Sequence, residues 1–266
     1  MLDDIFKKRE FFLIAGPCVI ENMEVLEETA FTLNELCKQY GIIYVFKCSY
    51  DKANRTSLSS YRGLGLQDGI KALSYIKEKY NVPITTDVHD IEEVALVKDV
   101  VDIIQIPAFL CRQTDLLLAA SNTGKPVNVK KGQFLAPWDM KNVLEKLTVT
   151  GNNHIIITER GTTFGYNNLV VDFRAFPIMR SFGYPVMFDV THSLQLPGGH
   201  GSTSGGQSMF APAMARAATA VGVDGLFMEV HPMPEKALCD GPNMVKLTDV
   251  ESILFDVTSI RNSVKK

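Results

Sequence analysis

An eleven-residue segment, 47–57, gathers many of the side chains of this 266-residue chain that could do chemistry. It follows an apolar, β-rich stretch at 42–46, so we predict that it begins where a buried strand ends in a loop. The segment has the sequence KCSYDKANRTS, with three cations, one carboxylate, one amide and several hydroxyls. Such side chains bind phosphate groups and sugar hydroxyls. On this segment alone, an ordinary polar turn is an equally good interpretation.

The elements that must position this segment are eight apolar strands that alternate with helices. We predict strands at 11–18, 42–48, 82–89, 102–107, 126–131, 154–160, 186–192 and 225–231. We predict helices at 22–39, 67–80, 91–99, 114–122, 138–147, 172–182, 208–221 and 248–264, and polar loops at 161–168 and 197–206.

Nearly continuous apolar strands are typical of a parallel sheet that is covered on both faces. No linker or low-complexity segment divides the chain. We therefore predict an α/β protein with the (β/α)8 TIM barrel fold, in a single domain at 1–266. A doubly wound open sheet is the alternative, but the chain has no G-x-G-x-x-G motif after its first strand.

Composition and charge narrow the classes of function. The chain is 46% hydrophobic and 21% charged, which is typical of a globular protein with a large core. Its net charge of −3 argues against nucleic acid, so an anionic ligand would need a local group of cations. We expect no signal peptide in the charged residues 1–10 and no membrane span. An odd number of scattered cysteines, five, favours reduced thiols in a cytoplasm.

Polar side chains recur at the carboxyl ends of the predicted strands, where a barrel enzyme has its active site. These positions are Cys18, residues 47–57, Asp87, His89, Gln105, Lys130, Arg160, His192 and Glu229. Six cations lack obvious partners nearby in the sequence: Lys47, Lys52, Arg55, Arg112, Lys130 and Arg160. They predict a positive mouth that suits a substrate with several negative charges, such as a phosphorylated acid or sugar.

A second set combines a thiol, an imidazole and two carboxylates, which suit a divalent transition metal such as Zn²⁺ or Fe²⁺. Its members are Cys18, His192, Glu229 and Asp240. They lie far apart in the sequence, so no local spacing supports a metal site. A small packed thiol is the commoner role of a lone cysteine such as Cys18.

Six motifs connect these positions to a known family. They are IAGPCVIE at 14–21, KANRTS at 52–57, QIPAFLCRQ at 105–113, VNVKKGQ at 127–133, TERGTTFGY at 158–166 and DVTHSLQLPGG at 189–199. Together they resemble the 3-deoxy-D-manno-octulosonate 8-phosphate synthases. The resemblance extends from about Phe12 to Asn243. It implies a (β/α)8 fold and, as is usual in that family, a homotetramer.

The resemblance implies that phosphoenolpyruvate, arabinose 5-phosphate and water give 3-deoxy-D-manno-octulosonate 8-phosphate and phosphate, for the inner core of lipopolysaccharide. Carbon 3 of the enol would attack the sugar aldehyde, and water would add at carbon 2. The tetrahedral intermediate would then lose phosphate through C–O cleavage. Both substrates are phosphorylated, which agrees with the predicted group of cations.

The resemblance also implies roles for individual residues. Four residues would bind the carboxylate side of phosphoenolpyruvate: Lys47, Ser49, Lys52 and Gln105. Two others, Lys130 and Arg160, would bind its phosphate. The sugar is bound by Asn54, Arg55 and Thr56, with Arg112 from a neighbouring subunit and with Pro107, Ala108 and Phe109 at the same subunit junction. We expect the catalytic residues to be Lys52, Asn54, Lys130, Arg160 and His192. The loop 197–206 would be a mobile lid.

Members of that family divide at the position of Cys18, where metal-dependent enzymes have Cys and metal-independent enzymes have Asn. The resemblance therefore implies a divalent metal, Zn²⁺, Fe²⁺ or Mn²⁺, that orients the water or the aldehyde. Its ligands would be Cys18, His192, Glu229 and Asp240. The sequence CDGPN at 239–243 resembles the metal-independent members instead, so the degree of metal dependence stays open.

Three other functions stay open. The related synthase that uses erythrose 4-phosphate usually has a K-P-R-T type of motif where this chain has KANR at 52–55, which makes Asn54 the discriminating position. A Schiff-base aldolase would use a desolvated lysine such as Lys130, although the neighbouring cations fit anion binding better. The third alternative is a non-catalytic phosphosugar-binding barrel.

Overall fold

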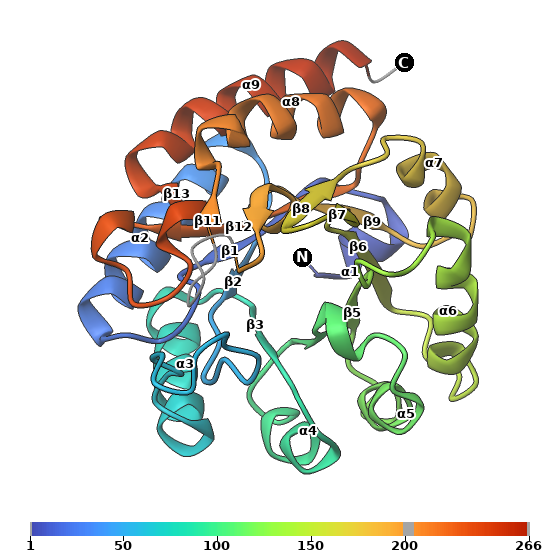
Figure 1. The fold of residues 1–266 in the computed structure, drawn as a ribbon, viewed down its shortest axis with the longest axis horizontal. Coiled ribbons are helices and arrows are strands. Elements are labelled where there is room, and N and C mark those ends of the chain that lie inside the picture. Colours follow the sequence, from blue (N-terminus) through green and yellow to red (C-terminus); the bar gives the residue numbers. More distant parts are fainter. Residues whose placement is uncertain (1, 199–204, 265–266) are drawn as a thin grey trace.

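Eight parallel strands form a closed barrel that is surrounded by helices (Figure 1). The computed structural model describes residues 2–198 and 205–264. The barrel strands are β1 (Phe12–Gly16), β2 (Ile43–Lys47), β3 (Ile84–Asp87), β4 (Ile103–Ile106), β5 (Val127–Lys130), β6 (Ile155–Glu159), β9 (Val186–Asp189) and β12 (Gly225–His231). The barrel closes where β12 pairs with β1, with Gly16 opposite Glu229. The predicted (β/α)8 fold is therefore confirmed.

Each barrel strand is followed by a helix in the part of the chain that the structure describes. These helices are α2 (Met23–Tyr40), α3 (Leu66–Tyr80), α4 (Ile91–Val97), α5 (Thr114–Asn122), α6 (Met140–Thr148), α7 (Ala175–Arg180), α8 (Ala211–Val221) and α9 (Val250–Val264). All the predicted ends lie within three residues of these bounds. None of the described helices combines the length and the apolar character that a membrane crossing needs.

Helix α2 shows why its ends can be predicted from the sequence. The side chain of Asn22 accepts a hydrogen bond from the amide of Val25 and so satisfies a free donor of the first turn. Gly41 ends the helix with a φ of 64°, a left-handed conformation that glycine adopts without steric cost. Capping residues of these types mark helix ends in the sequence itself.

Two predicted loops contain short strands. Residues 161–168, which the sequence predicts as a polar loop, belong to an antiparallel hairpin of β7 (Thr162–Gly165) and β8 (Asn168–Val170). The loop prediction is wrong because it follows polarity, whereas β-branched threonines favour strands and Asn167 takes the left-handed turn conformation with a φ of 55°. In the predicted lid 197–206, residues 199–204 lie outside the described part. At the end of this segment, β11 (Gly205–Gly206) pairs with β10 (Gln195–Leu196), which lies just before the segment.

An additional helix, α1 (Leu2–Lys7), precedes the barrel. Its Ile5 is fully buried against apolar residues that point into the barrel from the first half of the strands. In Figure 1, α1 lies across the middle of the ring of strands. The sequence does not predict this helix, because one buried residue in a charged segment gives no periodicity.

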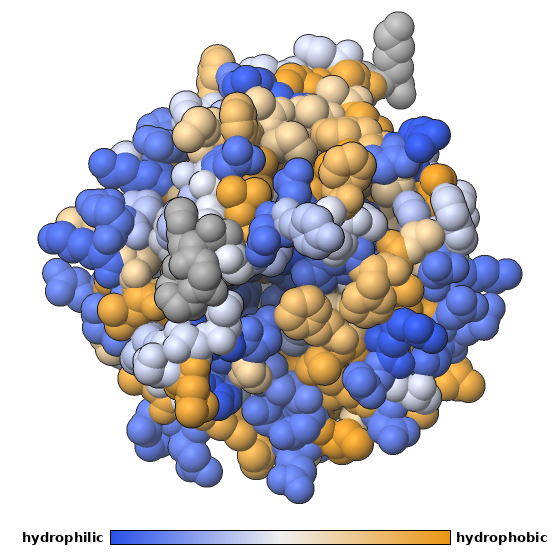
Figure 2. Space-filling model, in the orientation of Figure 1, coloured by the Kyte–Doolittle hydropathy of each residue, from blue (hydrophilic) through white to orange (hydrophobic). Residues whose placement is uncertain are grey.

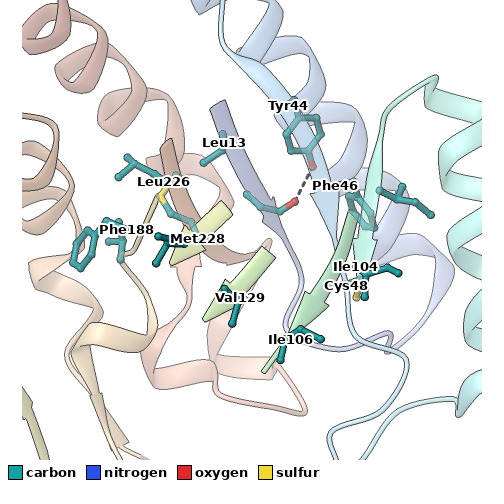
Figure 3. Packing of buried hydrophobic residues seen from close by; sticks show 14 of the residues in the cluster. Leu13, Tyr44, Phe46, Cys48, Ile104, Ile106, Val129, Phe188, Leu226 and Met228 are labelled. Atoms are coloured by element: carbon teal, nitrogen blue, oxygen red, sulfur yellow. Dashed lines mark hydrogen bonds between the residues drawn. The ribbon is translucent and has the colours of Figure 1, made fainter. Parts of the chain in front are cut away.

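The two faces of the barrel strands have different tasks. Most residues that face the helices are apolar, with Thr86 of β3 and Glu159 of β6 as exceptions. Figure 3 shows several of the hydrophobic ones: Leu13, Tyr44, Phe46, Ile104, Ile106, Val129, Phe188, Leu226 and Met228. The alternating residues face the barrel interior. In the first half of the strands these are Phe12, Ile14, Val45, Ile103, Ile156, Met187 and Phe227.

Towards the carboxyl ends of the strands, the inward-facing residues become polar. They are Lys47, Asp87, Gln105, Asn128, Lys130, Thr158, Asp189 and Glu229, and all are buried. With α1 at the opposite end, this pattern places the polar groups at the carboxyl end of the barrel.

Candidate active site

A cavity of about 550 Å³ lies at the carboxyl end of the barrel. Figure 2, in the orientation of Figure 1, shows hydrophilic residues around the hollow near the centre of this face. The predicted site residues that line the cavity are Lys47, Lys52, Asn54, Arg55, Thr56, Gln105, Pro107, Ala108, Phe109, Lys130, Arg160, His192 and Asp240. Most of the positions predicted from strand ends are thus brought together.

Four predicted residues do not line the cavity. Cys18, Ser49 and Glu229 are fully buried beneath it or beside it. Arg112 is exposed, and its carbonyl accepts a hydrogen bond of 3.1 Å from Lys146. Arg112 therefore lies outside the cavity lining of its own chain.

Two buried carboxylates fix the lysines of the cavity. The Oε1 atom of Glu229 is 3.3 Å from Nζ of Lys47 and 3.4 Å from Nζ of Lys52. The Oδ2 atom of Asp189 is 2.6 Å from Nζ of Lys130. These lysines have no partner near them in the sequence, and the fold supplies one from β9 or β12. The cavity is therefore less positive than the cations alone predict.

The lysines of β2 and β5 respond differently to burial. Burial and the charge of Lys52 act to lower the pKa of Lys47, but the charges of Asp87 and Glu229 outweigh them and the pKa is raised. For Lys130, burial dominates and lowers the pKa in spite of Asp189. Nζ of Lys130 also lies 3.5 Å from the centre of the Phe227 ring, which favours the charged form. Both lysines are held in place as donors for an anion.

A chain of hydrogen bonds joins buried side chains of β3 to β6. Thr158 donates to Oδ1 of Asn128 (2.6 Å), and Nδ2 of Asn128 donates to Oε1 of Gln105 (2.8 Å). Gln105 and Ser49 then donate to the two carboxylate oxygens of Asp87. An ionised carboxylate only accepts, so Asp87 fixes the direction of the whole chain and the orientation of the Gln105 amide.

Asp87 stays ionised although it is buried. Burial acts to raise its pKa, but the charges of Lys47, Lys52 and Lys130 hold that pKa well below its usual value. Nζ of Lys47 is 3.6 Å from its Oδ2 atom. Asp87 was predicted at a strand end without a role, and Asn128, which donates to Gln105 in the same chain of hydrogen bonds, was not predicted. The signal for both is a polar residue at an inward-facing position of an apolar strand.

Arg160 lines the cavity and has one guanidinium donor without a partner in the described residues. Its Nη2 atom donates to Oε1 of Gln195 (3.2 Å), whereas its buried Nη1 atom has no partner among the described residues. A buried guanidinium donor without a partner is costly, and a bound anion would satisfy it. Behind it, the buried Lys131 is 3.5 Å from Oε1 of Glu159 and donates to the carbonyl of Leu135 (3.0 Å). This ties together the loops that follow β5 and β6.

Three of the predicted metal ligands meet at one side of the cavity. The ligand atoms of His192, Glu229 and Asp240 lie within 4.8 Å of one another. The Oε2 atom of Glu229 is buried and has no hydrogen-bond partner in the described part of the chain. Nδ1 of His192 is 2.8 Å from Asp189, which leaves Nε2 free to bind a metal in a ring orientation set by a carboxylate. These residues fit a divalent transition metal.

The fourth predicted ligand, Cys18, belongs to a neighbouring group. Its ligand atom lies within 4.8 Å of those of Cys239 and Asp240, so Asp240 is common to both groups. Burial and the hydrogen bond with Cys239 raise the pKa of Cys18 well above its usual value. Cys239 was not predicted as a functional residue, because a single Cys beside an Asp carries no spacing signal.

We expect the hydrogen-bond chain to be energetically coupled. Asn128→Leu leaves Oε1 of Gln105 and the hydroxyl of Thr158 without their Asn128 partner and should lower the free energy of unfolding by about 1–3 kcal/mol for each unsatisfied group. Thr158→Val should also destabilise, but the double variant should cost about 1 kcal/mol less than the sum, because both partners are then gone. Urea unfolding of the four proteins measures this coupling. Thr29→Val is a control, since the buried Thr29 hydroxyl has no partner in the described residues, and it should be additive with Asn128→Leu.

His89, at the rim of the cavity, should give a pH-dependent contribution to stability. Its Nδ1 atom is 3.0 Å from Glu93; burial acts to lower the pKa of His89, but that hydrogen bond and the charge of Asp87 raise it overall. A raised folded-state pKa stabilises below the unfolded value of about 6.5, and the contribution is lost as the pH rises through the folded value. His89→Gln should therefore destabilise more at about pH 6 than at about pH 9.

Urea unfolding at both pH values measures this difference, and Glu93→Gln should show a difference of the same sign, because it removes the charge that faces His89. An equal loss of stability at both pH values would contradict the assignment.

The chain matches the model of the DAHP synthetase I family over residues 5–265. Similar curated proteins are named 2-dehydro-3-deoxyphosphooctonate aldolase. The protein of Geobacter sp. (strain M21) is 60% identical over 252 residues, which cover 95% of this chain and 92% of that protein. The protein of Cyanothece sp. (strain PCC 7425 / ATCC 29141) is 57% identical over 254 residues, which cover 96% and 93%. With a family match over nearly its whole length, this chain belongs to the DAHP synthetase I family.

Proposed function

We propose that this protein is a 3-deoxy-D-manno-octulosonate 8-phosphate synthase, the enzyme also named 2-dehydro-3-deoxyphosphooctonate aldolase. It condenses phosphoenolpyruvate with arabinose 5-phosphate and water, and releases phosphate, in the synthesis of the lipopolysaccharide inner core. The curated relatives support this reaction, because they share 56–60% identity over more than nine-tenths of the chain. Residues 1–266 form one catalytic domain, which acts in the cytoplasm.

The observation that carries the proposal is that Arg160, whose Nη1 donor has no partner among the described residues, lines the cavity together with Lys130. Together these two residues bind the phosphate of phosphoenolpyruvate. Lys47 and Lys52 bind its carboxylate, and Gln105 aids them through the second amide hydrogen, which the hydrogen-bond chain leaves unused. Ser49 acts through Asp87, because its hydroxyl donates to that carboxylate.

The sugar binds on the opposite side of the cavity, against the loop that follows β2. Asn54 contacts its hydroxyls, and Arg55 and Thr56 hold its phosphate. In the structure Arg55 Nη1 is 3.4 Å from Oδ1 of Asp240, so a bound phosphate competes with that carboxylate for the guanidinium. Asn54, the position that discriminates the two motifs, lines the cavity, which favours the five-carbon sugar over erythrose 4-phosphate.

The bond-forming steps need two anions held together and protons moved at defined atoms. Carbon 3 of phosphoenolpyruvate attacks carbon 1 of the sugar, whose oxygen takes up a proton. Water adds at carbon 2, and the C–O bond to phosphate breaks. Lys52 and Lys130 stabilise the negative charge of the reacting groups. Asp189 holds the ring of His192 through Nδ1, which fixes the orientation of its Nε2 atom at the reacting end of the cavity.

We further propose that a divalent metal is bound by Cys18, His192, Glu229 and Asp240. When bound, it supplies a Lewis acid that orients the water or the sugar aldehyde. A site that includes a thiolate and an imidazole favours Zn²⁺ or Fe²⁺ over Mn²⁺.

The test of the reaction measures phosphate release from phosphoenolpyruvate with arabinose 5-phosphate, before and after chelation and after return of Zn²⁺, Fe²⁺ or Mn²⁺. We expect chelation to lower the rate by more than about tenfold, and metal to restore it, because the bound metal stabilises developing charge. Metal content per chain, from mass spectrometry, should fall in Cys18→Ser but not in Cys111→Ser, a buried cysteine away from the site.

Three outcomes would overturn parts of the proposal. Turnover with erythrose 4-phosphate but not with arabinose 5-phosphate would assign the related synthase. Full activity in demonstrably metal-free protein would remove the metal role. Borohydride trapping of a lysine adduct would point to a Schiff-base aldolase.

We also propose that the enzyme is a homotetramer with Phe109 and Arg112 near a subunit interface. Support comes from large aromatic side chains that are exposed on successive loops at the carboxyl end, after β4, β5 and β6. They are Phe109, Phe134, Trp138, Phe164 and Tyr166. An exposed patch of this kind is typical of a protein interface.

The mass of the assembly in solution tests this state. Light scattering should give four times the 29.5 kDa of the chain. Phe109→Asp should lower that mass, because it places a charge in the interface, whereas the same change at the exposed Phe31 of α2 should not. A monomeric wild-type protein would refute the proposal.

A further inference from the structure

Two thiols lie in contact beside the proposed metal site. The Sγ atom of Cys18, which follows β1, is 3.0 Å from the Sγ atom of Cys239, in the segment after β12. Their exposed fractions are 0% and 2%. Strands β1 and β12 are neighbours at the closure of the barrel, so the fold itself brings these cysteines together from opposite ends of the chain. The sulfur atoms need to approach by only about 1 Å to reach the length of a disulfide bond.

The surroundings hold the two sulfur atoms in this arrangement. Both cysteines belong to a small apolar cluster with Val19 and Met244, which restricts their side chains. On the cavity side, Nη1 of Arg55 is 2.7 Å from Sγ of Cys239. Arg55 also lines the cavity, so one side chain contacts both the cavity and the sulfur pair.

We propose that Cys18 and Cys239 are a reversible oxidation site that closes to an intramolecular disulfide. The oxidant is a peroxide. The sulfur of Cys239 attacks one peroxide oxygen, giving a sulfenic acid and one water. The sulfur of Cys18 then attacks the sulfenic sulfur and displaces hydroxide, which takes the Cys18 proton and leaves as a second water. Two electrons pass from the thiols to the peroxide, and a thiol reductant reverses the change.

The disulfide removes Cys18 from the metal-ligand set. The metal binds the thiolate form of Cys18, and the sulfur of a disulfide is no longer a thiolate. Oxidation and metal binding therefore compete for the same atom. Oxidation also restrains the backbone next to Asp240, the carboxylate common to both groups of ligands. This consequence rests on the proposed metal site, whereas the disulfide itself does not.

The experiment treats metal-free, full-length protein with one equivalent of hydrogen peroxide, blocks the remaining thiols, and maps peptides by mass spectrometry without reduction. The expected product links the peptide of Cys18 to that of Cys239, at a mass lower by two hydrogens, and a thiol reductant reverses it. Cys37, Cys48 and Cys111, also buried, should stay free. No such linkage, or a sulfinic acid on Cys239 with Cys18 still free, would overturn the proposal.

Cysteine variants and Zn²⁺ loading test the disulfide independently of the proposed metal site. Cys239→Ser should abolish the linkage, whereas Cys111→Ser should retain it; if Cys239→Ser does not fold, the peptide map of the wild-type protein still decides. Protein loaded with Zn²⁺ should form the linkage at least about tenfold more slowly, since the metal holds the Cys18 sulfur. Equal rates with and without Zn²⁺ would overturn the competition with the metal, and the linkage map would stand independently of it.

Discussion

The buried carboxylate of Glu229 lies close to three basic side chains at the carboxyl end of the barrel. Lys47 and Lys52 lie within 3.4 Å of its Oε1 atom, and Nε2 of His192 lies 3.7 Å from it. Burial acts to raise the pKa of Glu229, but the charges of Lys52 and His192 hold it well below its usual value. A buried carboxylate of this kind is stable only while its partners stay in place. The lysines that face the cavity therefore depend on the strand at which the barrel closes.

The same principle operates across the floor of the cavity. Asp87 is the anionic end of the hydrogen-bond chain that begins at Thr158, and each donor in that chain has one possible direction. A rigid, directional network is costly if it is broken and specific if it is complete. It keeps the Gln105 amide in one orientation beside Asp87, so that the polar floor of the cavity is organised before any substrate arrives.

Asp240 links the cavity to the thiol pair. It forms ion pairs with Arg55, shares a group with His192 and Glu229, and lies 3.9 Å from the sulfur of Cys18. One carboxylate thus touches the proposed sugar phosphate site, the proposed metal site and the proposed oxidation site.

The sequence by itself determined the barrel and most of its rim. Apolar strands at regular spacing predict eight βα units, and a polar residue at each strand end predicts which residues meet, because parallel strands have their carboxyl ends together. Residues such as Lys130 and Arg160 could be placed in this way. The hairpin at 162–170 and α1 could not, since their signals are short and conflict with local polarity.

Only the tertiary structure decided which side chains of the site contact one another. The pairing of Lys47 with Glu229, the direction of the chain through Asn128 and the contact of Cys18 with Cys239 join residues that are far apart in sequence. Hydrophobic periodicity reports which face of a strand is inward, but not which side chain from another strand lies opposite it. That information depends on the closure of the barrel and on the register of its strands, which are set by packing over the whole chain.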